Sequence, residues 1–115
     1  MKTPSVMFSL ALLALTGCEQ GAGDSTSTTP ASATPSIGET VFKRTCKVCH
    51  SQGINGAPIY GNAAMWSERI TQGIPTLVEH ASNGYGLMPA KGGNTALTEE
   101  EITAAVTYMV DAVKP

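Results

Sequence analysis

The last part of the chain carries a stripe of apolar residues at helical spacing. Its members follow an i, i+3, i+4, i+7 pattern and are Ile102, Ala105, Val106, Met109, Val110 and Val113. Such a stripe is typical of a helix that buries one face. The segment Thr98-Glu99-Glu100-Glu101 precedes it and matches a capping box, with acidic side chains where the helix dipole favours negative charge. The pattern predicts a helix that begins after Thr98.

Three further helices are predicted upstream from residues that begin and end helices. Ser36 and Glu39 match a capping box that opens the first of them. Asn62 can cap the second, and Pro75 suits the first turn of the third, which Gly84 can end. No run of residues alternates between apolar and polar as a half-buried strand does. We therefore expect an all-α fold of three to five helices.

The N-terminal segment matches an export signal instead. Met1-Lys2 is followed by an apolar run from Val6 to Leu15 that is too short to span a bilayer. The run ends in Leu15-Thr16-Gly17-Cys18, which resembles the lipobox of bacterial lipoproteins and implies cleavage before Cys18 and lipidation of that residue. We expect a signal peptide over residues 1–17. The alternative is an ordinary signal cleaved near Gly17 or Ala22, which leaves a soluble periplasmic protein.

After Cys18 the composition changes to Gly, Ala, Ser, Thr and Pro as far as Pro35. Such a segment buries too little apolar surface to offset its ordering entropy, so residues 18–35 are predicted to be a flexible tether. Acyl chains on Cys18, at about 0.8 kcal/mol per buried CH₂, would anchor it to a bacterial membrane on the periplasmic face. Glu19 in the next position is typical of lipoproteins sorted to the outer membrane. The folded domain is expected over residues 36–115.

The segment Cys46-Lys47-Val48-Cys49-His50 is a C-x-x-C-H motif for covalent attachment of a c-type haem. Two thiols at this spacing reach the two vinyl groups along one porphyrin edge, and the adjacent imidazole can then reach the iron. A redox C-x-x-C motif or half of a structural zinc site is the alternative. The first would need a βαβ context and the second another pair of ligands downstream, and the sequence has neither.

Cysteine count and chain length agree with one haem c per chain. Of the 3 cysteines, one is assigned to lipid and two to haem, which leaves no thiol for a disulfide. A domain of about 80 residues buries too little apolar area to be robust alone, and haem adds a large flat apolar group to its core. We expect the haem-free chain to be largely unfolded.

A sixth iron ligand is predicted at Met88. This residue lies in Gly84-Tyr85-Gly86-Leu87-Met88-Pro89, a loop whose glycines allow close approach and whose proline limits flexibility. Met65, Met109 and His80 lie within predicted helices and are weaker candidates. A thioether opposite histidine raises the reduction potential, and it leaves no open coordination position.

These motifs together resemble those of class I cytochromes c, and specifically the bacterial cytochrome c5 group. The blocks that carry the resemblance follow one another in order: Cys46-Lys47-Val48-Cys49-His50, Gly56-Ala57-Pro58, the segment 66–73, His80-Ala81-Ser82-Asn83-Gly84, the segment 88–93 and Tyr108-Met109. They cover nearly all of the predicted domain. The resemblance implies a small cytochrome c fold, in which the helices surround one covalently bound haem.

The resemblance also implies roles for particular residues. His50 would be the proximal ligand, with its other ring nitrogen bonded to the carbonyl of Pro58. Trp66 and Arg69 would lie near a haem propionate, as indole donor and counter-charge, although plain core packing is an equal alternative for Trp66. One departure is that the segment 92–97 lacks the cysteine pair that members of the group often carry there.

Charge excludes one class of partner. Without Lys2, which leaves with the signal, the chain has 6 basic and 9 acidic residues, so nucleic acid is not an expected partner. Lys43, Arg44 and Lys47 cluster before the haem motif, with Lys91 near the Met88 loop. These cations either steer acidic partners to a haem edge or form a solvated helix face.

We interpret the sequence as a monohaem c-type cytochrome, a monomeric, membrane-anchored periplasmic electron carrier with redox protein donors and acceptors that the sequence does not identify. Two alternatives stay open. One is a haem enzyme, a peroxidase or a binder of small ligands, in which Met88 is labile. The other is a haem subunit held within a larger reductase or oxidase complex.

Overall fold

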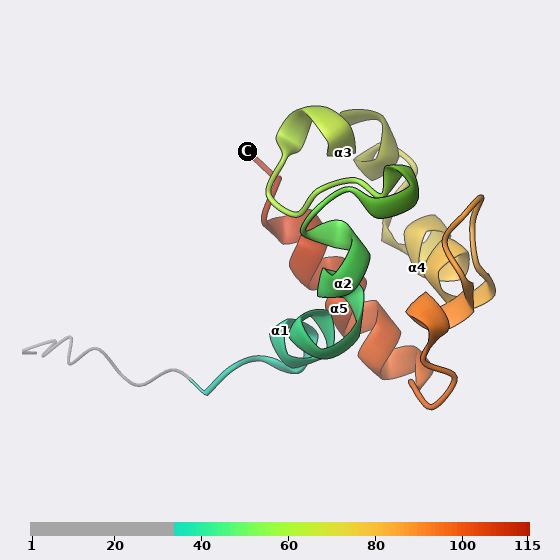
Figure 1. Ribbon diagram of the computed structural model, residues 1–115. Coiled ribbons are helices and arrows are strands. Elements are labelled where there is room, and N and C mark those ends of the chain that lie inside the picture. Colours follow the sequence, from blue (N-terminus) through green and yellow to red (C-terminus); the bar gives the residue numbers. More distant parts are fainter. Residues whose placement is uncertain (1–33) are drawn as a thin grey trace, which may run out of the picture. The chain divides into compact units, whose positions relative to one another are not determined.

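Helices make up most of the computed structural model, which describes residues 34–115 (Figure 1). They are α1 (Ile37–Val41), η1 (Phe42–Cys46), α2 (Lys47–His50), η2 (Ile54–Gly56), α3 (Ala63–Ile70), α4 (Ile74–Asn83), η3 (Ala90–Gly93) and α5 (Glu99–Asp111). Within residues 34–115 there is no strand, and Tyr85 and Met88 form an isolated bridge. The all-α prediction is confirmed. The predicted signal peptide, Cys18 and nearly all of the predicted tether lie outside the described residues.

The segments α1, η1 and α2 form one uninterrupted helical stretch that leads from the core to the C-x-x-C-H motif. It begins at Ser36, whose hydroxyl accepts from the backbone N–H of Glu39 at 3.1 Å. The Glu39 carboxylate does not complete the capping box, because it pairs with Lys43 at 2.6 Å. The middle segment is a π-helical turn, a wider turn that often marks a functional site. It ends at Cys46, the first cysteine of the motif.

Helix α1 crosses α5 at a position that only glycine can occupy (Figure 1). A Cβ atom on Gly38 would lie 2.8 Å from the carbonyl carbon of Ala104 and 2.9 Å from Cβ of Tyr108. Beside this crossing the ring of Phe42 packs 5.6 Å from that of Tyr108 and 4.6 Å from that of Tyr60. A hydrogen bond to Tyr108 and burial raise the pKa of Tyr60 to about 12. The absence of a side chain at Gly38 thus sets how closely the two terminal helices approach.

The other predicted helix ends are present. The Asn62 side chain accepts from the backbone N–H of Met65 at 3.2 Å, and Pro75 lies in the first turn of α4. The capping box of α5 is complete, because the Thr98 hydroxyl and the Glu101 carboxylate each accept from the other's backbone N–H. Buried apolar residues from α1, η1, α3, α4 and α5 then form one core. Within residues 34–115, none of the helices has the length and apolar composition that a membrane span requires.

Candidate haem-binding site

A cavity of about 490 Å³ collects every residue predicted to hold the cofactor. The predicted residues that line it are Cys46, Cys49, His50, Pro58, Trp66, Arg69 and Met88. Apolar side chains from α4 and α5 form its inner wall: Leu77, Ala81, Val106 and Met109. Its volume lies within the range of about 300–1,000 Å³ found for cofactor pockets. The fold therefore brings together residues that lie up to 63 positions apart along the chain.

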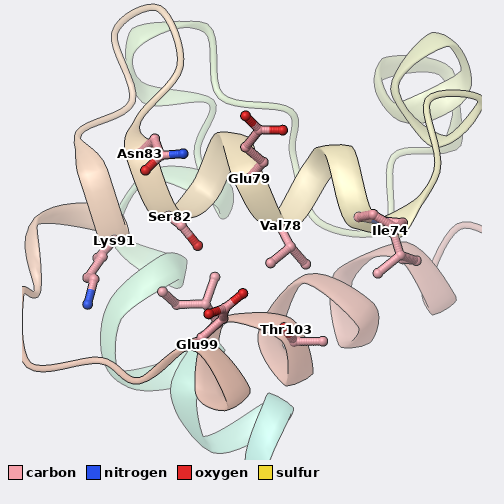
Figure 2. Close-up of a pocket in the computed structure, with 10 residues that line it drawn as sticks. Ile74, Val78, Glu79, Ser82, Asn83, Lys91, Glu99 and Thr103 are labelled. Atoms are coloured by element: carbon pink, nitrogen blue, oxygen red, sulfur yellow. The ribbon is translucent and has the colours of Figure 1, made fainter.

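A second hollow lies between α4 and the start of α5 and has a volume of about 530 Å³ (Figure 2). It is lined by charged and polar side chains, including Glu79, Glu99, Lys91 and Ser82, together with apolar residues of the two helices. None of the Cys, His or Met residues within 34–115 lines it. The donor chemistry therefore assigns the cofactor to the first cavity.

His50 is held with one ring nitrogen committed and the other available. The side chain is buried, with 6% of its surface exposed. Its Nδ1 lies 2.8 Å from the carbonyl oxygen of Pro58. This is the pair of groups that the family resemblance implies. Because a carbonyl only accepts hydrogen bonds, Nδ1 carries a proton, and in the neutral imidazole Nε2 then keeps its lone pair. The His50 carbonyl itself accepts from the backbone N–H of Tyr60 at 2.7 Å, which fixes the loop between them.

The two motif cysteines form no disulfide with another described residue, and both are half-buried at the cavity wall. Burial raises the pKa of the Cys46 thiol above its ordinary value, so this side chain is neutral at pH 7. Cys46 ends the π-helical turn η1, and Cys49 lies in α2 one helical turn later. Both thiols are therefore presented to one cavity from one rigid helical segment.

Trp66 and Arg69 lie one turn apart on α3, and both line the cavity. The resemblance implied that the indole N–H of Trp66 donates to a haem propionate. In the structure this N–H donates to the carbonyl of Ile59 at 2.8 Å. The side chain is buried and its ring centroid lies 6.1 Å from that of His50. Arg69 donates to the carbonyl of Met65 at 2.6 Å and brings a positive charge to the cavity wall. Of the two contacts that the resemblance implies for a propionate, the counter-charge of Arg69 is the one still available.

Met88 enters the cavity on a tight turn. Met88 and Tyr85 exchange two backbone hydrogen bonds of 3.0 Å each. Gly84, at φ +89°, makes the approach to this turn, and a Cβ there would lie 3.0 Å from both the Met88 carbonyl oxygen and the Ala90 nitrogen. Among the weaker candidates, Met65 does not line the cavity, whereas Met109 and His80 do. The ring of His80 stacks on that of Tyr85, with the two centroids 4.1 Å apart.

Some lining residues could not be found from the sequence. Tyr85 and Leu87 reach the cavity although they are 61% and 72% exposed, and Ile54 joins them from η2. Their positions depend on backbone turns that carry no periodic signal. The carbonyl of Ile59, which accepts from Trp66, was also not predicted, because a backbone acceptor is not visible as a residue type.

The site fits a covalently attached haem. It offers two cysteine thiols, an imidazole with a basic nitrogen, an apolar wall and one cationic side chain. An all-helical domain with this donor set at one cavity defines a c-type cytochrome.

Comparisons with known proteins agree with this class. Residues 33–109 match the family described as cytochrome c oxidase, cbb3-type, subunit III. The chain is 44% identical over 81 residues to cytochrome c-555 of Chlorobaculum tepidum, covering 67% of this chain and 75% of that protein. It is 31% identical over 71 residues to cytochrome c5 of Ectopseudomonas mendocina, covering 60% of this chain and 82% of that protein.

The fold of a solved structure also matches. A chain in the crystal structure of an electron transfer complex of nitrite reductase with cytochrome c superposes with a TM-score of 0.65 at 38% identity, covering 68% of this chain and 95% of that chain. This chain belongs to the cytochrome c family, among the class I c-type cytochromes. It is a monohaem electron carrier with one covalent haem c. Identity to the c-555 protein exceeds that to cytochrome c5, the group that the motifs alone indicated.

Proposed function

We propose that this cytochrome is a membrane-anchored periplasmic electron carrier in which His50 and Met88 are the axial ligands. The observation that carries the proposal is that His50 and Met88 line the same cavity, with Nδ1 of His50 bonded to Pro58 and Nε2 left basic. When bound, the haem supplies one-electron chemistry, and a thioether opposite histidine favours the reduced state. Two permanent ligands exclude substrate from the iron, which suits a carrier rather than an enzyme.

The residues around the two ligands act by holding them still. Pro58 orients the imidazole of His50, and Trp66 closes the cavity wall beside it through its bond to Ile59. A ligand pair that keeps its geometry in both oxidation states has little reorganisation to undergo on electron transfer. The apolar wall excludes water and so supports a high reduction potential.

Replacing Met88 with alanine tests the ligand assignment. The oxidised wild-type holoprotein should show the thioether-to-iron charge-transfer band, and Met88→Ala should lose it. The reduction potential should fall by about 0.1 V or more, because the axial ligand is a main determinant of haem potential. Absorption spectra in both oxidation states and a redox titration are the measurements.

Met65→Ala is the matched control, because Met65 is half-buried on α3 but does not line the cavity. It should keep both the charge-transfer band and the reduction potential.

Binding of carbon monoxide distinguishes the carrier from an enzyme with a labile methionine. The ferrous wild type should not bind it, whereas ferrous Met88→Ala should. Binding by the native wild type would favour the enzyme.

The anchor rests on Cys18 and the Leu15-Thr16-Gly17 sequence before it. Lipidation there would place the haem domain at the periplasmic face of a bacterial membrane, with the outer membrane indicated by Glu19. The intact mass of the mature protein tests this directly. We expect a chain that begins at Cys18 and carries acyl groups, and an unmodified chain that begins elsewhere would contradict the anchor.

We further propose that the partners are redox proteins, which the tethered monomer meets one at a time. Arg44, just before the haem motif, and Lys47, within it, are exposed and can attract an acidic docking surface. The matched solved structure is of a cytochrome c in an electron transfer complex with nitrite reductase, which supports a redox enzyme as the kind of acceptor.

One observation favours a second candidate function. The matching family is described as a subunit of a cbb3-type cytochrome c oxidase, so a permanent haem subunit of a larger complex is the alternative to a free carrier. Extraction of natively expressed protein in mild detergent, followed by native gel electrophoresis, distinguishes the free carrier from the subunit. A carrier should migrate alone, and a subunit should migrate with a fixed partner.

A further inference from the structure

The loop that follows Met88 is fastened to the core by one ammonium group. Lys91 is half-buried, and its Nζ donates to the carbonyl of Leu97 at 2.7 Å. Leu97 is itself buried in the core, with 6% of its surface exposed. Figure 2 shows Lys91 at one end of the hollow between α4 and α5. Lys91 does not line the cofactor cavity. The ammonium is therefore committed to the loop, which is a different role from the partner steering expected of it.

The same loop is also fastened to the haem-binding helix. Asn94 donates from Nδ2 to the hydroxyl of Thr45 at 3.4 Å. Next to this bond, a Cβ on Gly92 would lie 3.2 Å from the Thr45 methyl group, so the backbone of the loop approaches that side chain closely. Thr45 immediately precedes Cys46. The contact therefore packs the loop that follows Met88 against the helical segment that carries the two motif cysteines.

The backbone of this loop is strained at Lys91. Lys91 has a φ of +55°, a left-handed conformation that residues with a side chain rarely adopt. Such a conformation persists only where surrounding contacts determine it. The bond from Lys91 to Leu97 and the contact of Gly92 with Thr45 are contacts of this kind. The loop is thus held in place at a cost to its own backbone.

We propose that Lys91, together with the contact of Gly92 and Asn94 with Thr45, positions Met88 opposite His50 and keeps it from leaving the iron. This inference rests on the proposed ligation by Met88. Hydrogen bonds from a charged donor are about twice as strong as neutral ones, so the bond from Lys91 is the stronger fastening. Its loss raises the fraction of molecules in which the loop is open and Met88 is released.

Imidazole added to the ferric holoprotein measures that fraction, because it binds the iron only when Met88 has left. We expect Lys91→Leu, which keeps an apolar stem and removes the donor, to bind imidazole about tenfold more tightly than the wild type. Lys91→Arg restores a charged donor and should return the affinity close to that of the wild type. Lys114→Leu removes the same charge from an exposed ion pair with Asp111 and should change nothing.

A steric test addresses the contact with Thr45. Gly92→Ala inserts a Cβ against the Thr45 methyl group and should also tighten imidazole binding. Adding Thr45→Ser removes that methyl group but keeps the hydroxyl that accepts from Asn94. The double variant should therefore bind imidazole more weakly than Gly92→Ala alone, and the remaining difference from the wild type reports the positive φ of +62° at Gly92.

The outcomes separate this inference from the ligand assignment. If the wild type lacks the thioether charge-transfer band, ligation by Met88 is wrong and the positioning role goes with it. If the wild type has the band and Lys91→Leu binds imidazole no more tightly than Lys114→Leu, Met88 is the ligand but Lys91 does not position it. A tighter affinity that Lys91→Arg fails to reverse also overturns the role of the charged donor.

Discussion

Replacing Gly38 with alanine is expected to destabilise the holoprotein by about 3 kcal/mol or more. The new Cβ would lie 2.8 Å from the carbonyl carbon of Ala104 and 2.9 Å from Cβ of Tyr108. Both neighbours belong to the backbone or to its first side-chain atom, so neither can rotate away. The crossing of α1 and α5 must open, and the packing of Phe42 on Tyr108 opens with it.

The sign of this effect distinguishes packing from helix propensity. Alanine in a helix interior is favoured over glycine by roughly 0.5–1 kcal/mol, so propensity alone predicts a more stable protein. Thr40→Ala is the matched control, because Thr40 lies on the same helix and is exposed. Urea unfolding followed by circular dichroism measures both variants. A Gly38→Ala protein as stable as Thr40→Ala would contradict the close crossing.

The second large effect is expected when both motif cysteines are replaced. The double variant Cys46→Ala, Cys49→Ala cannot form thioether bonds, so the cavity of about 490 Å³ at the centre of the domain loses its covalent occupant. An unfilled cavity costs about 24 cal/mol per Å³, which for this volume amounts to about 12 kcal/mol and is comparable to the whole stability of a small domain. We expect a chain with little helix and no cooperative thermal transition.

Circular dichroism in the far and near ultraviolet is the measurement for this variant. Cys18→Ala is the matched control, since it removes a cysteine outside the haem motif and should keep haem, helicity and a cooperative melt. A haem-free double variant with full helicity and a sharp melt would show that the apolar wall of α4 and α5 collapses by itself. The domain would then fold without the haem, and the haem would not be a required part of its core.

The helix ends could be predicted because they depend on neighbours in the chain. Asn62, Pro75 and Thr98 begin helices in the structure through bonds or ring geometry that reach no further than four residues. The π-helical turn η1 was not predicted, since its wider turn leaves no separate period in the sequence. The half capping box at Ser36 was not predicted either, because the sequence does not show that Lys43 competes for the Glu39 carboxylate.

Side-chain roles were predicted less well than side-chain positions. Trp66 lies at the cavity, but its N–H is used by the carbonyl of Ile59, and Lys91 lies near the Met88 loop, but its ammonium is used by the carbonyl of Leu97. In both cases the partner is a backbone acceptor. Every residue carries such an acceptor, so the sequence offers no way to choose among them.

By itself, the sequence determined the covalent chemistry of this protein. Cys46, Cys49 and His50 are close because they are adjacent in the chain, so any fold would present them together. Only the tertiary structure decided what completes the site: that Met88 and not Met65 reaches the cavity, and that Thr45 and Leu97 hold the loop that carries it. The bond from Asn94 to Thr45 joins residues 49 positions apart in the chain. Packing of the helices against one another brings these two residues together, and no local sequence pattern indicates it.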